Sequence, residues 1–307
     1  MPVTVPPHAP FVTFLDFPHV SDLDSLQADI AIMGLPYGDP YTAAEVTNDQ
    51  TNAPTAVRRA SPRLSLGLDR WDFDIGGTLF NGRDLRVVDV GDVTMRIGDP
   101  GGHYRRAEQA ARKILGAGAR LISIGGDHGV PIPVFRALDV LGPVTLVHID
   151  AHLDWRDEVN GVREGYSSPI RRASEMPHIR RIVQIGMRGQ GSARTEEVEA
   201  ARKWGAEIIT AWELQDRGMA SVLASIPDGG RYYLTIDADG IDPSVMPAVA
   251  APAPGGVSYR DAIALIKGLC RKGTLVGMDV VEITPERDIN EITAIAAKTR
   301  NAIVGRL

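Results

Sequence analysis

The chain has 307 residues, 44% of them hydrophobic, and a formal net charge of −6 at pH 7. This length allows one large core, and the negative charge argues against nucleic acid or an anionic membrane as the main partner. The single cysteine, Cys270, excludes an internal disulfide framework and fits a reducing compartment.

No targeting or membrane-spanning segment is expected. The N-terminal stretch MPVTVPPHAP lacks a basic region and is broken by prolines, unlike a signal peptide. No apolar run approaches the roughly 20 residues that span a bilayer. We therefore expect a soluble, cytoplasmic protein, and we expect Cys270, which lies in an apolar helical stretch, to be buried in the core.

Strand-like and helix-like segments alternate along most of the chain. Runs rich in β-branched residues predict eight strands, at residues 29–34, 85–90, 120–124, 144–150, 181–185, 207–211, 231–237 and 274–281. Apolar residues three or four apart predict helices at residues 104–115, 131–141, 195–204, 219–226, 259–271 and 290–304. Most strands are apolar almost throughout, which is typical of a parallel sheet covered on both faces and predicts a wound α/β sandwich. No linker interrupts the pattern, which favours a single domain over residues 1–307.

Four long stretches have few apolar runs and are expected to be irregular. They comprise residues 36–61, 71–83, 155–168 and 242–257. We expect them to emerge near one rim of the sheet and to wall a pocket there. Trp155 is expected to shape this pocket, whereas packing roles are expected for Trp71 and Phe73.

Three clusters of acidic residues and histidines each follow an apolar run. They read GGDH, VHIDAHLD and LTIDADGIDP, and their candidate ligands are His128, Asp150, His152, Asp154, Asp237 and Asp239. Ligands in α/β sheets bind at the carboxyl ends of the strands, and alternate residues of a strand project from the same face. The three clusters should therefore face one site.

Four carboxylates and two imidazoles suit a pair of divalent cations. Two such ions about 3.5–4 Å apart can share a water and lower its pKa, and a carboxylate can bridge them because it has two oxygens. A single catalytic zinc would normally take only three protein ligands. Structural ion pairs and helix caps are the alternative for these residues.

The motifs GGDH, DAHxD and DxDxxDP occur here in an order and spacing that resemble the ureohydrolases: arginase, agmatinase and related guanidino-compound hydrolases. The resemblance extends from GLPYGDP near the start to MDVVEITPERD near the end. It implies the arginase-like fold, a three-layer α/β/α sandwich with an eight-stranded parallel sheet. It also implies a homo-oligomer, usually a trimer or hexamer; a hetero-oligomer with a paralogous subunit is the alternative.

The resemblance further implies a role for each candidate ligand. The implied first metal ion is held by His128 and Asp154, the second by His152 and Asp239, and Asp150 and Asp237 bridge the two. Asp154 would also hold the attacking hydroxide.

The family also places a glutamate at the end of the last strand, where this chain has Glu282 in DVVEITP. A buried carboxylate there can accept a bidentate hydrogen bond from a planar guanidinium and orient its carbon. An ion pair with a neighbouring basic residue is the alternative role for Glu282.

The chain departs from the family at the expected proton shuttle. The family has a His-Gly pair shortly after DAHxD, whereas this chain reads EGYSSPIRRASE, with Tyr166 or Ser167 in that place. His178 is expected to be an ordinary surface residue. The leaving amine needs a proton, which Tyr166 could relay through water.

Two further departures concern the substrate pocket. The family's Gly-Ala-Arg-x-Gly-Pro segment is replaced by TNDQTNAPTAVRR, which offers the polar side chains of Asn48, Asp49, Gln50 and Asn52. Its Gly-Thr-Gly element is replaced by Ala248, Val249 and Ala250. Such a wall, more apolar and with few charged anchors, favours a small or alkyl-substituted guanidine or a biguanide over arginine. Guanidino acids and agmatine-like amines are the alternatives.

The sequence thus predicts a binuclear metal-dependent amidinohydrolase that releases an amine plus urea or a substituted urea. The family most often uses Mn2+, and Ni2+ is possible because the ligands do not discriminate between them. Two alternatives remain open: a weakly active metal-binding subunit of a hetero-oligomer, and a deacetylase-like amidohydrolase with one zinc and a catalytic tyrosine.

Overall fold

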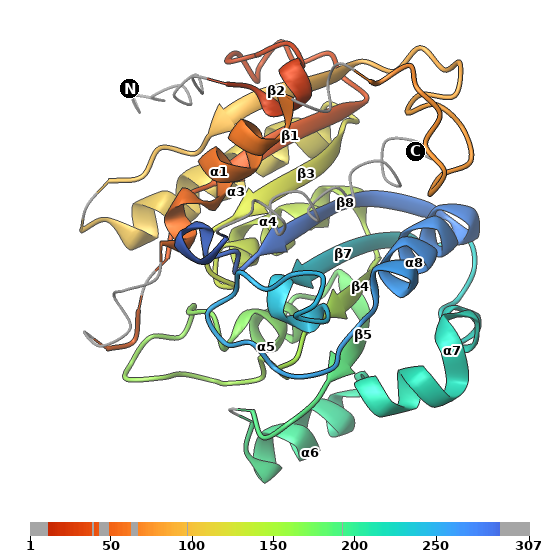
Figure 1. The fold of residues 1–307 in the computed structure, drawn as a ribbon. Coiled ribbons are helices and arrows are strands. Elements are labelled where there is room, and N and C mark those ends of the chain that lie inside the picture. Colours follow the sequence, from red (N-terminus) through yellow and green to blue (C-terminus); the bar gives the residue numbers. More distant parts are fainter. Residues whose placement is uncertain are drawn as a thin grey trace.

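The computed structural model describes residues 12–38, 40–42, 49–62, 67–96, 98–191 and 193–288. Its described residues contain eight strands: β1 (Ile30–Leu35), β2 (Val87–Asp92), β3 (Arg120–Gly125), β4 (Val144–Ile149), β5 (Ile179–Met187), β6 (Glu207–Thr210), β7 (Arg231–Asp237) and β8 (Thr274–Val281). They form one sheet in the order β2-β1-β3-β8-β7-β4-β5-β6 (Figure 1). All neighbouring strands are parallel, which confirms the predicted sheet.

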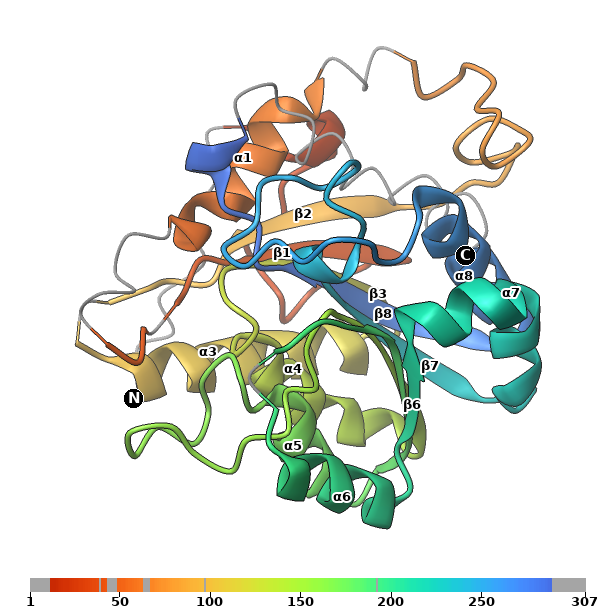
Figure 2. The ribbon, with the colours of Figure 1, turned by 60° about the horizontal axis from the view of Figure 1, so that its bottom comes forward.

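Helices cover both faces of this sheet. The helices of the described residues are α1 (Ala53–Ala60), α3 (Pro100–Gly116), α4 (Pro131–Ala137), α5 (Pro169–Ser174), α6 (Thr195–Trp204), α7 (Ala211–Ser225) and α8 (Tyr259–Lys272). Short 3-10 turns accompany them: η1 (Phe14–Asp16), η3 (Gln50–Asn52), η4 (Leu138–Leu141), η5 (Ala238–Gly240) and η6 (Pro285–Arg287). In Figure 2, α3 to α6 lie below the sheet and α1, α7 and α8 lie above it.

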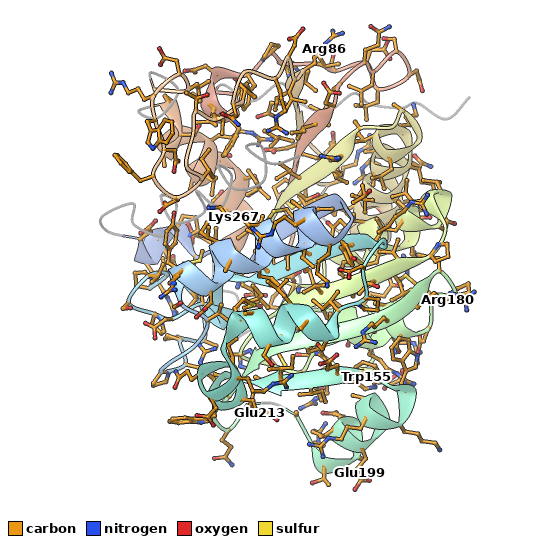
Figure 3. The ribbon with its side chains drawn as sticks, turned by 90° about the vertical axis from the view of Figure 1, so that its right-hand side faces the viewer. Arg86, Trp155, Arg180, Glu199, Glu213 and Lys267 are labelled. Atoms are coloured by element: carbon orange, nitrogen blue, oxygen red, sulfur yellow. The ribbon has the colours of Figure 1, made fainter. Side chains whose placement is uncertain are left out.

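Two apolar layers hold the three-layer sandwich together. One layer joins α1, α7 and α8 to the sheet, and the other joins α3 to α6 to the opposite face. Figure 3 looks from the side of the first layer, with Lys267 on α8 and Glu213 on α7 in front of the strands. The α/β/α sandwich expected from the sequence is therefore confirmed.

Most predicted elements lie within two or three residues of those observed, with one larger difference at α7. The sequence predicted only residues 219–226 as a helix. The helix begins earlier because Thr210 and Glu213 form a capping box, in which the Thr210 hydroxyl accepts from the Glu213 amide at 3.1 Å. A positive φ of 74° at Gly218 kinks the helix and interrupts the apolar periodicity.

Three expectations were wrong or only partly right. Residues 36–61 were expected to be irregular, but they contain α1. The buried face of α1 includes Arg58, so the apolar stripe of this helix is short. Trp71 and Phe73 were expected to pack, yet they are 61% and 90% exposed. Cys270 is only half-buried, at the margin of the layer under α8.

Two expectations concern residues outside the described part of the chain. The predicted helix at residues 290–304 lies there, as does Asn48. Among the described helices, none is long and apolar enough to span a bilayer.

Candidate metal centre and active site

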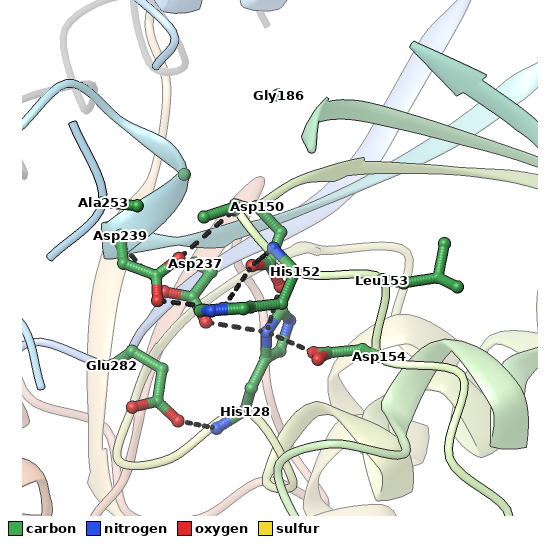
Figure 4. Close-up of polar contacts among 12 residues, drawn as sticks. His128, Asp150, His152, Leu153, Asp154, Gly186, Asp237, Asp239, Ala253 and Glu282 are labelled. Atoms are coloured by element: carbon green, nitrogen blue, oxygen red, sulfur yellow. Dashed lines mark hydrogen bonds and ion pairs between the residues drawn. The ribbon is translucent and has the colours of Figure 1, made fainter. Parts of the chain in front are cut away.

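The candidate site lies where four neighbouring strands end. β3, β8, β7 and β4 are adjacent and parallel, so their carboxyl ends meet at one edge of the sheet. His128 lies in the turn after β3, Asp150 and Glu282 directly follow β4 and β8, and Asp237 ends β7. Residues far apart in the sequence therefore converge, as Figure 4 shows.

One cluster surrounds the His128 imidazole. Its Nδ1 atom lies 3.2 Å from Asp150 Oδ2, and 3.1 Å from an Oδ2 atom of each of Asp154 and Asp237. Burial alone would lower the pKa of His128, but the three carboxylates outweigh burial and raise the pKa well above its usual value. A nitrogen facing three carboxylate oxygens in a buried space has the donor set of a divalent cation site.

A second cluster surrounds His152. Its Nδ1 atom lies 3.4 Å from Asp150 Oδ1 and 3.2 Å from Asp239 Oδ2. Contacts with these two carboxylates raise the pKa of His152 to about 12. Asp150 therefore belongs to both clusters, with one carboxylate oxygen in each.

The buried negative charge fits bound cations. Burial and the neighbouring carboxylates of Asp239 and Asp150 raise the pKa of Asp237 well above its usual value. Burial and the Asp150 carboxylate likewise raise the pKa of Asp154 to about 7. Because uncompensated buried charge is unfavourable, this concentration of carboxylates suits positive ions bound among them.

A third histidine, His148, was not singled out from the sequence. The Gln184 side-chain amide donates to His148 Nδ1 at 3.1 Å and to the Leu153 carbonyl at 2.8 Å. His148 Nε2 therefore carries the proton and donates to Asp150 Oδ2 at 2.8 Å. His148 could be considered a ligand from its position alone, but this hydrogen bond makes it a support for Asp150. Its place near the end of β4, two residues before Asp150, was an available signal.

Two further buried residues orient His128. Thr235 and Asp279 face each other in the register of β7 and β8. The Thr235 hydroxyl donates to Asp279 Oδ1 at 2.6 Å, so its oxygen accepts from His128 Nε2 at 3.0 Å. This leaves Nδ1 of His128 facing the carboxylates. The sequence did not indicate this pair, because the contact depends on strand order and register.

The cavity beside these clusters has a volume of about 580 Å³. Acidic residues and a histidine form part of its lining: Asp127, His152, Asp154, Asp237, Asp239 and Glu282. Neutral residues also line it: Gly38, Pro40, Tyr41, Thr51, Val159, Tyr166, Ser167, Ala250 and Ala251. Gln50 and Arg156 also line it. Two aromatic rings, those of Tyr41 and Tyr166, lie with their centroids 4.3 Å apart.

Glu282 faces this cavity from a strained backbone position. Its φ is +63°, which is unusual for a residue with a side chain, and its Oε1 atom accepts a hydrogen bond from the His128 amide at 2.8 Å. Burial and the nearby Asp127 carboxylate raise the pKa of Glu282 well above its usual value. Asp127 was not singled out from the sequence, although it belongs to the GGDH motif.

Some residues predicted near the pocket lie elsewhere. Trp155 is buried against Trp204 and does not line the cavity, which corrects its predicted role. Asp49 instead accepts a hydrogen bond from the Glu286 amide, at 3.1 Å, and Asn52 is exposed. His178, expected to be an ordinary surface residue, is instead half-buried, with Nε2 donating to the Phe135 carbonyl at 2.7 Å.

The expected Ala-Val-Ala wall is only partly in the cavity. Ala250 lines it together with Ala251. Ala248 and Val249 are buried beside the end of β8, where the Ala248 carbonyl accepts from the Thr284 amide at 2.8 Å.

Known proteins resemble this chain over nearly its whole length. The sequence model of the Arginase family matches residues 28–301. An agmatinase from Photorhabdus laumondii is 34% identical over 93% of this chain and 89% of the relative. A guanidinobutyrase from Pseudomonas aeruginosa is 32% identical over 92% of this chain and 88% of the relative.

A solved structure agrees with this assignment. The crystal structure of a hypothetical agmatinase from Burkholderia thailandensis superposes with a TM-score of 0.78 and 30% identity, covering 97% of this chain and 89% of that one. The chain therefore belongs to the arginase family, which confirms the resemblance seen in the sequence and the expected class of enzyme, a hydrolase of C–N bonds in linear amidines.

Proposed function

We propose that this chain is a binuclear metal-dependent hydrolase that cleaves a guanidino-type C–N bond and releases an amine plus urea or a substituted urea. The observation that carries this proposal is the position of Asp150. Its Oδ2 atom lies 3.2 Å from the His128 imidazole, and its Oδ1 atom lies 3.4 Å from the His152 imidazole. A carboxylate with one oxygen in each cluster suits a bridge between two cations.

The proposed ligands are His128, Asp150, His152, Asp154, Asp237 and Asp239. Mn2+ is the proposed ion by family, with Ni2+ as the alternative. Two bound ions would supply a water of lowered pKa and positive charge beside the scissile carbon.

The chain's own residues would then bind and orient the substrate. The Glu282 carboxylate would accept hydrogen bonds from the guanidinium and turn its carbon towards the clusters. The Asp154 carboxylate would accept a hydrogen bond from the attacking water. The hydroxyl of Tyr166, which also lines the cavity, would relay a proton to the leaving amine.

The neutral part of the lining supports a substrate with little charge beyond its guanidine. Apart from the proposed ligand His152, Arg156 is the one basic residue among the described lining residues, and its Nε atom lies 3.2 Å from a Glu197 carboxylate oxygen. This ion pair balances the charge that would otherwise attract a substrate carboxylate. The tyrosines, alanines and Val159 offer an apolar surface, so we propose a small or alkyl-substituted guanidine or a biguanide rather than arginine.

The test is to load the purified chain separately with Mn2+ and Ni2+ and to assay a panel of guanidino compounds for released amine and urea. We expect turnover of an alkylated guanidine or a biguanide. Asp150→Asn should lose both turnover and bound metal, because a neutral amide bridges two cations poorly. Asp216→Asn, an exposed change of the same kind on α7, should retain both.

Other outcomes would contradict parts of the proposal. Full metal content and turnover in Asp150→Asn would refute the bridging role. Preferred turnover of arginine would refute the proposed substrate class. The purified chain could also bind two metal ions per subunit and yet turn over no compound. This result would indicate that activity requires a paralogous subunit.

A further inference from the structure

One of the segments in which the sequence departs from the family pattern reaches the carboxylate proposed to bind substrate. The Gln50 side-chain amide donates a hydrogen bond to Oε2 of Glu282, across 232 residues of sequence. Both side chains are 8% exposed, and both line the cavity. We propose that Gln50 is a positioning residue, which fixes the plane of the Glu282 carboxylate for a guanidinium. This inference rests on the proposed function.

Two donors are needed to fix that plane. The terminal torsion of a glutamate is soft, so one hydrogen bond leaves the carboxylate free to rotate about the bonded oxygen. The His128 amide donates to Oε1 at 2.8 Å, and the Gln50 amide holds Oε2. Since an ionised carboxylate offers about four lone-pair sites, two remain for the parallel N–H groups of a guanidinium.

An uncharged donor suits this position. Lysine or arginine at position 50 would neutralise Glu282 and repel a cationic substrate, whereas an amide leaves the negative charge in place. The Glu282 backbone is also fixed, because its amide donates to the Gly126 carbonyl at 2.8 Å. With backbone and carboxylate plane both held, the substrate meets a preorganised acceptor.

The scaffold behind Gln50 is anchored on both sides. One residue earlier, Asp49 Oδ1 accepts from the Glu286 amide at 3.1 Å, which ties this turn to the chain beyond β8. Directly after η3, α1 is held by the buried Arg58, whose Nε donates to Asp89 Oδ2 at 2.8 Å. The turn is therefore placed independently of its contact with Glu282.

The experiment compares binding and turnover in variants of one turn. Gln50→Met removes the donor with little change of shape, and Gln50→Glu keeps the shape but replaces the donor by an acceptor. Asn52→Leu is the matched control, because Asn52 is an exposed amide two residues away that does not line the cavity. Guanidinium chloride is the binding probe in calorimetry of the metal-loaded chain, and metal content is measured for each variant.

We expect Gln50→Met to weaken guanidinium binding and raise KM at least about tenfold, as for loss of a hydrogen bond to a charged group. The loss of kcat should be smaller, and bound metal should be unchanged. Gln50→Glu should also lose affinity, because a carboxylate at position 50 cannot donate to Glu282 and would repel it from its position. Asn52→Leu should match the original chain.

Three results would overturn the inference, and they differ from one another. In the first result, the unaltered chain binds guanidinium, and both Gln50→Met and Gln50→Glu bind it as tightly as the unaltered chain does. Only the role of Gln50 then fails. If both Gln50 variants lose metal or fail to fold, the residue is structural and not a positioning residue. If the unaltered chain neither binds guanidinium nor turns over any guanidino compound, the proposed function fails with it.

Discussion

Two tyrosines, Tyr41 and Tyr166, line the cavity and pack against each other. The Tyr41 hydroxyl accepts a hydrogen bond from the Ser167 amide at 3.0 Å, and burial raises the pKa of Tyr41. Tyr166, which with Ser167 is a candidate for the place of the family's proton shuttle, is half-buried against the Tyr41 ring. The two rings pack together, so removal of one hydroxyl leaves the wall in place.

We predict that Tyr166→Phe lowers kcat about tenfold to a hundredfold and changes KM little, because a lost proton relay slows chemistry and not binding. Tyr41→Phe is the control: it removes a hydroxyl from the same wall and should lower kcat much less. Steady-state kinetics on the best substrate of the panel measures both. Equal rates in Tyr166→Phe and the unaltered chain would return Tyr166 to a packing role.

For single residues, the sequence indicated the candidate metal ligands but not the residues that orient them by hydrogen bonds. The GGDH, DAHxD and D-x-D motifs were sufficient to predict that six candidate ligands lie near one another. Asp279 and Thr235 could not be selected, because each reads as one polar residue within an apolar strand. Gln50 was one of four polar candidates in its segment, and only the contact with Glu282 distinguishes it.

A buried ion pair fixes α1 against β2, a strand at the edge of the sheet. Arg58 is 1% exposed and makes two parallel hydrogen bonds to Asp89, from Nε at 2.8 Å and from Nη2 at 3.0 Å. The Asp89 carboxylate also accepts from the Phe14 amide at 2.8 Å. This bidentate pair joins α1, β2 and the N-terminal η1 turn.

We predict that Arg58→Met lowers the free energy of unfolding by about 3–5 kcal/mol, because it leaves Asp89 as a buried charge without its cation. Arg59→Met, an exposed change on the same helix, should cost less than about 0.5 kcal/mol. Urea denaturation followed by circular dichroism measures both values. Similar unfolding midpoints for the two variants would show that the pair adds little.

The elements were predicted best where the chain is most apolar. β7 and β8 have the predicted bounds, because each is a continuous buried run that ends at polar residues. α1 was missed because a buried arginine interrupts its apolar face. The exposure of Trp71 and Phe73 could not be predicted, because composition does not tell which side of a loop faces solvent.

Across the whole molecule, the layer formed by α3 to α6 contains an unusual buried histidine. His103 on α3 is fully buried and stacks on Tyr37, with ring centroids 4.8 Å apart. Neither ring nitrogen has a hydrogen-bond partner among the described residues. Burial, reinforced by the Arg106 charge, lowers the pKa of His103 to about 4.

His103 should make the fold sensitive to acid. Between pH 6.5 and about 4, the unfolded chain binds a proton at this residue that the folded chain does not, so stability falls as the pH falls. The free energy of unfolding should fall between pH 7 and pH 4. We predict that this fall is about 2–3 kcal/mol smaller in His103→Phe, which keeps the ring stacking. Denaturation curves of both proteins at several pH values test this. If the free energy of unfolding falls equally with pH in both proteins, His103 does not cause the acid sensitivity.

The position of β8 has a consequence for biosynthesis. Among the described residues β8 is the last strand in sequence, yet it lies between β3 and β7 and joins the two parts of the sheet. Before β8 is inserted, the ends of β3 and β7, which carry His128 and Asp237, are not neighbours. A nascent chain therefore presents incomplete sets of ligands until residues near 282 have left the ribosome. High-affinity metal uptake should accordingly mark the end of folding.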